Sequence, residues 1–177
     1  MSMLAQVVFA LWVVLPAYLP NSSAALFGGG KPIDAGKTWK GRRVLGDGKT
    51  WRGIFAGVLS GSLLGLVMNY VNSVFGLGFP NFPVSVLVLL PLGAMLGDLM
   101  ASFVKRRLGK ERGGAFPLVD QLDFLIGALA LVYIFNYSWS IQNIGLTLIA
   151  ILFVLTPVVH LSVNAVGYCL GVKNEPW

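Results

Sequence analysis

Three aspartates stand inside or at the start of apolar stretches, where a charged side chain is energetically costly. Asp98 lies within the apolar run 84–104, and Asp120 and Asp123 open the run 117–137. Residues at i and i+3 of a helix share one face, so the second and third carboxylates should point the same way. Intramembrane carboxylates usually face a bundle interior, a cavity or a partner. We therefore expect the three to converge on a hard divalent cation such as Mg²⁺, which also binds phosphate oxygens.

Ion pairing is the alternative interpretation of the same aspartates. They would then form salt bridges with Lys105, Arg106 or Arg112. Such pairs would be scaffolding and would require no metal. Three carboxylates near one depth favour the metal site over this scaffold.

A basic segment ahead of the second apolar run could bind phosphate. It contains a near-repeat of six residues, GKTWKG at 36–41 and GKTWRG at 48–53. A Walker A motif needs a glycine five residues before its Gly-Lys-Thr, and Lys31 and Arg43 occupy those positions. The sequence thus excludes a classical P-loop, although glycine-rich backbone with lysine and hydroxyl groups can still hold phosphates. The alternative is a solvated loop with tryptophans at the membrane interface.

The composition places these groups in a membrane protein. Of 177 residues, 56% are hydrophobic and only 11% are charged, whereas soluble domains carry about a quarter charged residues. The net charge is +6, but the basic residues lie between long apolar runs, which favours phospholipid headgroups and phosphate-bearing substrates over nucleic acid. The single cysteine excludes a disulfide framework or a cysteine metal site.

Five apolar stretches meet or approach the roughly 20 residues that a membrane-spanning helix needs. They are approximately 3–20, 53–75, 84–104, 117–137 and 143–170. With five spans, all 13 basic residues fall on one face, in the loops 28–52 and 105–116 and after the last span. The positive-inside rule makes that face cytoplasmic, with the N-terminus outside and the C-terminus inside. We expect one all-α membrane domain over 1–177, with its first segment retained because no basic residue precedes Lys31.

Other features of the spans have mainly structural interpretations. Glycines at 53, 57, 61 and 65 form one smooth helix face, which predicts close helix packing, with a homodimer interface as the alternative. His160, the single histidine, is expected to be bonded within the bundle. The lack of a second histidine or a reactive cysteine argues against catalytic dyads and histidine-rich metal sites. The segment PNSS at 20–23 is expected to end the first span, and with Gly28–Gly30 forms either a flexible turn or a nucleotide contact.

Several motifs together resemble one enzyme family. They are GD-x₃-S-x₂-KR at 97–106, P-x₂-D-x₂-D at 117–123, PNS at 20–22 and GKTWRG at 48–53. This combination resembles the CDP-diacylglycerol synthase (phosphatidate cytidylyltransferase) family, and most closely its short archaeal branch, the CDP-archaeol synthases. The chain departs from the bacterial pattern at Lys110-Glu111, at Arg112-Gly113-Gly114, which lacks a histidine, and at Gln121. These departures favour the archaeal branch.

The resemblance implies transfer of CMP from CTP to a membrane lipid phosphate, with Mg²⁺ as cofactor and release of pyrophosphate. The archaeal branch implies an acceptor with isoprenoid ether chains, such as unsaturated archaetidic acid (2,3-di-O-geranylgeranylglyceryl phosphate), at a site facing the cytoplasm. The motifs assign metal binding and catalysis to Asp98, Asp120 and Asp123, with Lys105 as a further catalytic residue. They assign substrate binding to Asn21, Ser22, Lys49, Thr50, Arg52, Ser102 and Arg106.

Two other functions fit parts of the pattern. A CTP-dependent polyprenol kinase would use a similar scaffold but would release CDP. A transporter or channel could use an intramembrane acidic ion site, although transporters place such sites near the midplane, and these carboxylates cluster at one face. A CDP-alcohol phosphotransferase is excluded, because its D-x₂-D-G-x₂-A-R motif is absent.

Overall fold

The structure, a computed structural model, is a helix bundle and describes residues 2–110, 114 and 116–171. In a lipid environment every backbone polar group must be satisfied internally, so long apolar segments fold as helices. The elements are α1 (Met3–Phe27), β1 (Thr38–Trp39), β2 (Arg42–Arg43), α2 (Trp51–Phe75), α3 (Val84–Arg107), α4 (Val119–Phe135), α5 (Tyr137–Asn143) and α6 (Leu146–Cys169). The predicted all-helical class is thus confirmed, with one hairpin of two two-residue strands added in the basic loop.

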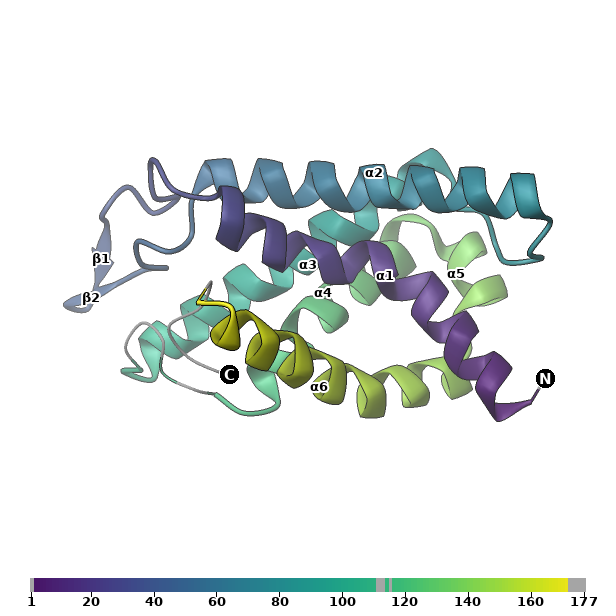
Figure 1. The fold of residues 1–177 in the computed structure, drawn as a ribbon. Helices are drawn as coiled ribbons and strands as arrows, with labels where there is room; N and C mark the ends of the chain where they lie inside the picture. Colours follow the sequence, from purple (N-terminus) through teal and green to yellow (C-terminus); the bar gives the residue numbers. More distant parts are fainter. Residues whose placement is uncertain (1, 111–113, 115, 172–177) are drawn as a thin grey trace.

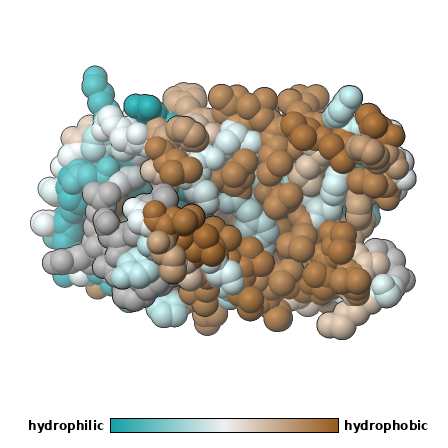
Figure 2. Space-filling model, in the orientation of Figure 1, coloured by the Kyte–Doolittle hydropathy of each residue, from teal (hydrophilic) through white to brown (hydrophobic). Residues whose placement is uncertain are grey.

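Four of the described helices, α1, α2, α3 and α6, are long and apolar enough to cross a membrane. The predicted fourth span is shorter than expected: α4 has 17 residues, which gives a length of about 26 Å at 1.5 Å per residue. The predicted connection after it, 138–142, is helical throughout, within α5. The start of α1 and the end of α6 lie at opposite ends of the bundle (Figure 1). Hydrophilic surface gathers at the hairpin end, and apolar surface covers most of the remaining length on this face (Figure 2).

The first helix is longer than the sequence predicts. It continues through the PNSS segment to Phe27, so Asn21 and Ser22 lie inside α1 and do not end it. Pro20 has no N–H to donate to the carbonyl of Pro16, yet membrane helices tolerate such prolines when neighbouring helices cover the gap. Here α2 packs so closely that a Cβ on Gly61 would stand 2.5 Å from that carbonyl oxygen.

The glycine face of α2 is buried inside the chain. A Cβ on Gly57 would stand 3.0 Å from the carbonyl oxygen of Pro20 and 2.8 Å from the sulfur of Met95, on α3. Gly61 likewise meets Pro16 on one side and Pro91 of α3 on the other. The prediction of close helix packing is confirmed. The alternative, a homodimer through this face, is wrong, because α1 and α3 already cover it.

A second glycine contact joins α3 to α4. A Cβ on Gly97 would overlap the carbonyl oxygen of Asp123, and one on Gly127 would overlap the carbonyl oxygen of Gly93. The two helix backbones therefore touch. Since Asp98 follows Gly97 directly, this contact brings the carboxylates of α3 and α4 to one place.

Candidate active site

A polar pocket opens at the hydrophilic end of the bundle. Its volume is about 460 Å³, within the range of roughly 300–1,000 Å³ usual for small-molecule sites. Six segments contribute to its wall: α1, the basic loop, α2, α3, α4 and α6. The polar side chains that line it are Asn21, Asp47, Lys49, Thr50, Asp98, Ser102, Lys105, Asp120, Asp123, His160 and Asn164.

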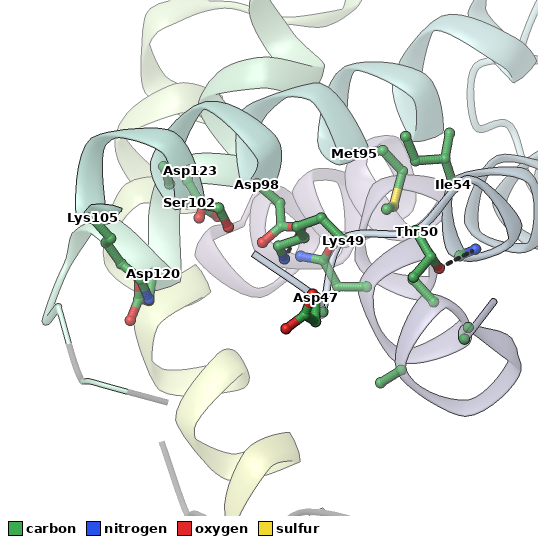
Figure 3. Close-up of a pocket in the computed structure, with 18 of the residues that line it drawn as sticks. Asp47, Lys49, Thr50, Ile54, Met95, Asp98, Ser102, Lys105, Asp120 and Asp123 are labelled. Carbon is green, nitrogen blue, oxygen red and sulfur yellow. Dashed lines mark hydrogen bonds and ion pairs between the residues drawn. The ribbon is translucent and has the colours of Figure 1, made fainter. Parts of the chain in front are cut away.

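The three aspartates predicted to act together line this one pocket (Figure 3). Asp98, Ser102 and Lys105 stand at i, i+4 and i+7 on α3, so they share a helix face. Asp120 and Asp123 come from the first two turns of α4. Because two different helices supply the carboxylates, the pocket depends on the glycine contact between α3 and α4.

Lysines hold two of the three carboxylates. Lys49 Nζ lies 2.5 Å from Asp98 Oδ2, and Lys105 Nζ lies 2.8 Å from Asp120 Oδ1. The Asp123 carboxylate instead accepts a hydrogen bond from the backbone N–H of Phe124 at 2.5 Å. Among the described residues no group of three or more histidine, cysteine or acidic side chains is already arranged around a metal position. Two of the aspartates that would bind a cation are thus ion-paired with lysines, so the structure shows part of the alternative interpretation as well. Arg112, a further expected partner, lies outside the described residues.

The loop that carries Lys49 is organised around a buried carboxylate. The side chain of Asp34 is only 1% exposed, and its oxygens accept hydrogen bonds from Arg43 Nη2 at 2.7 Å and Nε at 3.3 Å. The backbone N–H groups of Leu45 and Gly46 donate to it at 3.0 Å, and that of Gly36 at 3.1 Å. The Arg43 guanidinium, with help from these N–H groups, holds the pKa of the Asp34 carboxyl well below its usual range.

The C-terminal end of α3 fixes the same loop from the other side. Arg107 donates to the carbonyl oxygens of Trp39 at 2.7 Å, Arg42 at 3.2 Å and Arg43 at 2.6 Å. Arg42 in turn donates to the carbonyl of Arg107 at 3.0 Å, and the Trp39 ring stacks on Phe103 at a centroid distance of 5.8 Å. The loop is therefore a folded element docked on α3, and it sets the position of Lys49.

We expect Asp34→Asn to loosen this loop. Because the folded-state pKa lies below the unfolded value of about 3.9, the interaction stabilises the loop above that pH and is lost as pH falls through the folded pKa. At neutral pH the substitution removes the charge that Arg43 needs. Limited trypsin digestion at the lysines and arginines of 37–43 should then be about tenfold faster than in wild type.

Asp47→Asn is the matched control, since Asp47 pairs with the same arginine but its side chain is 65% exposed. Its cleavage rate should stay close to wild type. The hydrogen-exchange protection factors of the Leu45 and Gly46 amides should also fall in wild-type protein below about pH 4 and stay flat in Asp34→Asn. Equal protection of the loop in both variants at neutral pH would contradict this role.

The remaining predicted substrate-binding residues divide between the polar pocket and its surroundings. Asn21, Lys49, Thr50 and Ser102 line the polar pocket, and the Thr50 hydroxyl also caps α2 by accepting from Gly53 N–H at 3.1 Å. Arg106 lines an adjoining cavity of about 160 Å³ that also includes Lys49 and Lys105, and Ser22 lines a separate apolar groove. Arg52 is exposed and lines none of these cavities, because it lies on the outer side of the first turn of α2.

Sequence reasoning missed three polar residues of the pocket. Asp47 belongs to the Asp-Gly-Lys-Thr run that supplies Lys49. Its position two residues before Lys49 was the sequence feature that could have indicated a place in the pocket. His160 and Asn164 stand at i and i+4 on α6, with 3.2 Å between His160 Nδ1 and Asn164 Nδ2. His160 is bonded within the bundle as predicted, but it also faces the pocket. Of the departures from the bacterial pattern, Glu111, Arg112 and Gly113 lie outside the described residues.

Comparisons with known proteins identify the family to which this chain is similar. The family model described as CarS-like, CDP-archaeol synthase, matches residues 3–177. The CDP-archaeol synthase of Halobacterium salinarum is 48% identical over 181 residues, covering 100% of both chains. That of Methanosphaerula palustris is 53% identical over 167 residues, covering 93% of this chain and 100% of its own. A solved structure of an intramembrane enzyme for archaeal membrane lipids biosynthesis is 36% identical with a TM-score of 0.73, covering 88% of this chain and 92% of the other.

Proposed function

Since this chain belongs to the CDP-archaeol synthase family, we propose that it transfers CMP from CTP to a lipid phosphate with isoprenoid ether chains, forming CDP-archaeol and pyrophosphate. The chain is an enzyme of membrane lipid biosynthesis, as its relatives and the matched intramembrane enzyme are. One observation carries the proposal for the site. Four aspartates, among them the three from α3 and α4, and two lysines line a single pocket at the polar end of an apolar bundle, where a soluble nucleotide and a membrane-held acceptor can meet.

The reaction needs little from the protein beyond alignment and charge neutralisation. An ionised oxygen of the lipid phosphate attacks the α-phosphorus of CTP, the new P–O bond forms, and the bond to the β-phosphate breaks with its electron pair leaving on pyrophosphate. No side-chain nucleophile is required, which fits a pocket whose described lining includes no cysteine. Holding the two phosphates in line supplies most of the rate enhancement.

The lysines and the start of α2 are suited to binding the phosphates of the nucleotide. Lys49 and Lys105 bring positive charge to the pocket, and Thr50 and Gly53 place the N-terminal turn of α2 in its wall. The N-terminus of a helix carries partial positive charge and favours anions. A triphosphate entering the pocket would draw the lysines away from Asp98 and Asp120. Those carboxylates would then be available for a cation.

The donor set fits Mg²⁺, which prefers carboxylate and phosphate oxygens to softer ligands. Asp98, Asp120 and Asp123 are the residues that would hold it, since all three line the pocket and come from two helices in contact. When bound, such an ion neutralises the triphosphate and the leaving pyrophosphate. Ser102, one turn from Asp98 and 8% exposed, would donate a hydrogen bond to the same phosphate oxygens.

We further propose that the pocket faces the cytoplasm and that α4 is a fifth, short span. The described basic residues lie in 31–52 and 105–110, at the hydrophilic end of the bundle, which the positive-inside rule makes cytoplasmic. With α4 counted as a span, the N-terminus lies outside the cell and the C-terminus lies in the cytoplasm. At about 26 Å, α4 is shorter than a hydrocarbon core of about 30 Å. A polar pocket at the start of α4 would let water reach the first turn of the helix, so α4 would not need to cover the full thickness of the core.

Product analysis tests the proposed reaction. Purified protein is incubated with Mg²⁺, with either the unsaturated ether-lipid phosphate or a polyprenol as acceptor, and with CTP labelled in either the α- or the γ-phosphate. We expect α-label in the lipid product and γ-label in pyrophosphate. Label from the γ-phosphate in the lipid, together with CDP, would instead establish the kinase. Absence of any labelled lipid would contradict both reactions and favour the transporter.

A further inference from the structure

A basic hairpin, residues 36–43, stands at the hydrophilic end of the bundle (Figure 1). It contains the first copy of the near-repeat, GKTWKG, whose lysines the proposed reaction does not use. Its strands pair antiparallel, with Trp39 opposite Arg42. Lys40 and Gly41 form the turn with positive φ values of 51° and 75°, as two-residue hairpin turns require. The hairpin is thus an ordered element whose side chains have no assigned role.

The exposed surface of the basic hairpin is positively charged. Three of its cationic side chains are exposed: Lys37, Lys40 and Arg42. The two acidic residues of the loop, Asp34 and Asp47, both pair with Arg43. Within the described residues of this loop, the three exposed cations are therefore not neutralised by an ion pair. Such a surface attracts anions.

The hairpin lies against the outer side of α3. The Trp39 ring stacks on Phe103 at a centroid distance of 5.8 Å and remains 51% exposed. Phe103 shares a helix face with Met100, which stands three residues before it and is 71% exposed. Asp98, which lines the polar pocket, precedes Met100 by two residues, about 200° around the helix, so the pocket lies on the opposite side. Trp39 therefore packs on the side of α3 that faces lipid.

Apolar exposed surface on α3 continues past the level of Trp39. Val104 is 44% exposed, and Leu108, at the end of the helix, is 60% exposed. Leu108 stands five residues beyond Phe103, which is about 7.5 Å along the axis at 1.5 Å per residue. Since exposed apolar side chains on a spanning helix contact lipid, the apolar boundary reaches the level of the Trp39 ring. Tryptophan is enriched at this boundary, where its ring meets the headgroups.

Arg107 holds the hairpin in this position. Its guanidinium carbon lies 5.2 Å from the Trp39 ring centroid and 5.3 Å from that of Phe103. The same guanidinium donates to three carbonyl oxygens of the hairpin. A surface that is already ordered loses less conformational freedom when it binds. The hairpin therefore presents its cations from a fixed backbone beside an interfacial ring.

We propose that the basic hairpin is a docking surface for the anionic headgroups of membrane lipids. Its three exposed cations contact the headgroup phosphates, and Trp39 lies at the interface beside them. Charge complementarity and the depth of Trp39 select this occupant, whereas a second copy of the hairpin would carry like charge. Each Lys or Arg near an anionic membrane surface strengthens binding about fivefold. The inference does not depend on the reaction that the polar pocket catalyses. Docking would hold the loop that positions Lys49 against the membrane surface.

Competition between lipids beside Trp39 tests this proposal without turnover. The full chain is reconstituted in phosphatidylcholine that is brominated along its chains and quenches tryptophans in contact with it. Unbrominated phosphatidylglycerol or phosphatidylcholine is then added as the competitor. The difference between wild type and Trp39→Phe isolates the fluorescence of Trp39. We expect brominated lipid to quench Trp39, and phosphatidylglycerol to relieve the quenching with an affinity at least about tenfold above that of phosphatidylcholine.

Two double variants with the same loss of charge separate the hairpin from the rest of the basic surface. Lys37→Gln with Lys40→Gln should lower the preference for phosphatidylglycerol at least about fivefold. Lys31→Gln with Arg52→Gln is the matched control, because both residues are exposed but lie outside the hairpin. Its preference should stay within about twofold of wild type. Each variant is measured with and without Trp39→Phe.

Three outcomes would overturn the proposal. Trp39 that brominated lipid does not quench would place the hairpin in water, where a soluble acidic partner could reach it. Equal affinities for the two lipids would leave an interface without headgroup recognition, and equal losses in the two double variants would indicate a diffuse field. If the hairpin variant has a lowered Tm, wild type alone still decides: its preference should disappear at about 1 M salt, and a preference that persists there would contradict charge pairing.

Discussion

Replacing any one of Asp98, Asp120 or Asp123 with asparagine should lower turnover at least about a hundredfold, while the protein remains folded. Asparagine keeps the shape of the side chain but removes the charge that a hard cation needs. A hundredfold loss corresponds to roughly 2.7 kcal/mol of transition-state stabilisation, at about 1.4 kcal/mol per decade. Turnover measured across a Mg²⁺ titration, alongside the melting temperature, gives both quantities for each variant.

The double variant separates a shared site from independent contributions. Residues that act as a unit show non-additive losses, so Asp120→Asn with Asp123→Asn should be little worse than the poorer single variant. A purely structural role predicts the reverse pattern, with a lowered melting temperature and near-normal turnover in the protein that survives. If both single variants melt normally and keep wild-type turnover and Mg²⁺ dependence, the proposed site is wrong.

The second large effect should come from Lys49→Gln, which we expect to lower kcat/KM for CTP about a hundredfold. Lys49 Nζ lies 2.5 Å from Asp98 and is the cation that the folded loop delivers to the pocket. Glutamine retains hydrogen bonding but cannot neutralise a phosphate. Steady-state kinetics with CTP as the varied substrate measures the loss.

Lys40→Gln is the control, because Lys40 belongs to the first copy of the near-repeat in the same loop but does not line the pocket. Its Nζ atom instead lies over the Trp39 ring, 6.0 Å from the ring centroid. Its kcat/KM should stay within about twofold of wild type. Arg52→Ala should cost less than Lys49→Gln, although the motif predicts similar roles, since Arg52 does not line the pocket. Equal losses in all three variants would indicate a diffuse electrostatic effect instead of a specific contact.

The sequence predicts the polar end of the molecule well, because charges inside apolar runs are too costly to be accidental. That principle alone identifies Asp98, Asp120 and Asp123, and spacing places the last two on one helix face. The basic residues of the loops identify the end of the bundle where the pocket lies. Lys49 and Thr50 follow from the GKTWRG motif, and the structure places both in the pocket wall.

The sequence predicts less about contacts between distant segments. The end of α1 is missed because Pro20 and the polar residues after it have the local signature of a helix terminus, while tertiary packing against α2 stabilises the helix beyond them. Gly93 and Gly97 form one four-residue pair on α3, a weaker signal than the four glycines of α2, whereas Gly127 on α4 has no glycine four residues away. The sequence therefore does not indicate that α3 meets α4 at Gly127, the contact that brings Asp98 beside Asp123.

The sequence did not predict that Asp34 organises the loop or that His160 lines the pocket, for a related reason. Asp34 stands in a polar loop, where a carboxylate has no evident cost, and only the folded loop shows that five hydrogen bonds from Arg43, Gly36, Leu45 and Gly46 converge on it. A lone histidine in an apolar helix is ordinarily bonded within the core. Its position between a polar pocket and an apolar groove depends on how α6 packs against α1 and α4.

We propose that the pocket at the polar end binds CTP together with Mg²⁺. Equilibrium binding of CTP to purified, lipid-free protein across a Mg²⁺ titration tests it most directly, with wild type and Asp98→Asn compared. We predict that Mg²⁺ strengthens CTP binding to wild type at least about tenfold, and that Asp98→Asn loses this dependence while keeping its melting temperature. CTP affinity that is independent of Mg²⁺ in wild type, or an unchanged Mg²⁺ dependence in Asp98→Asn, would contradict the account.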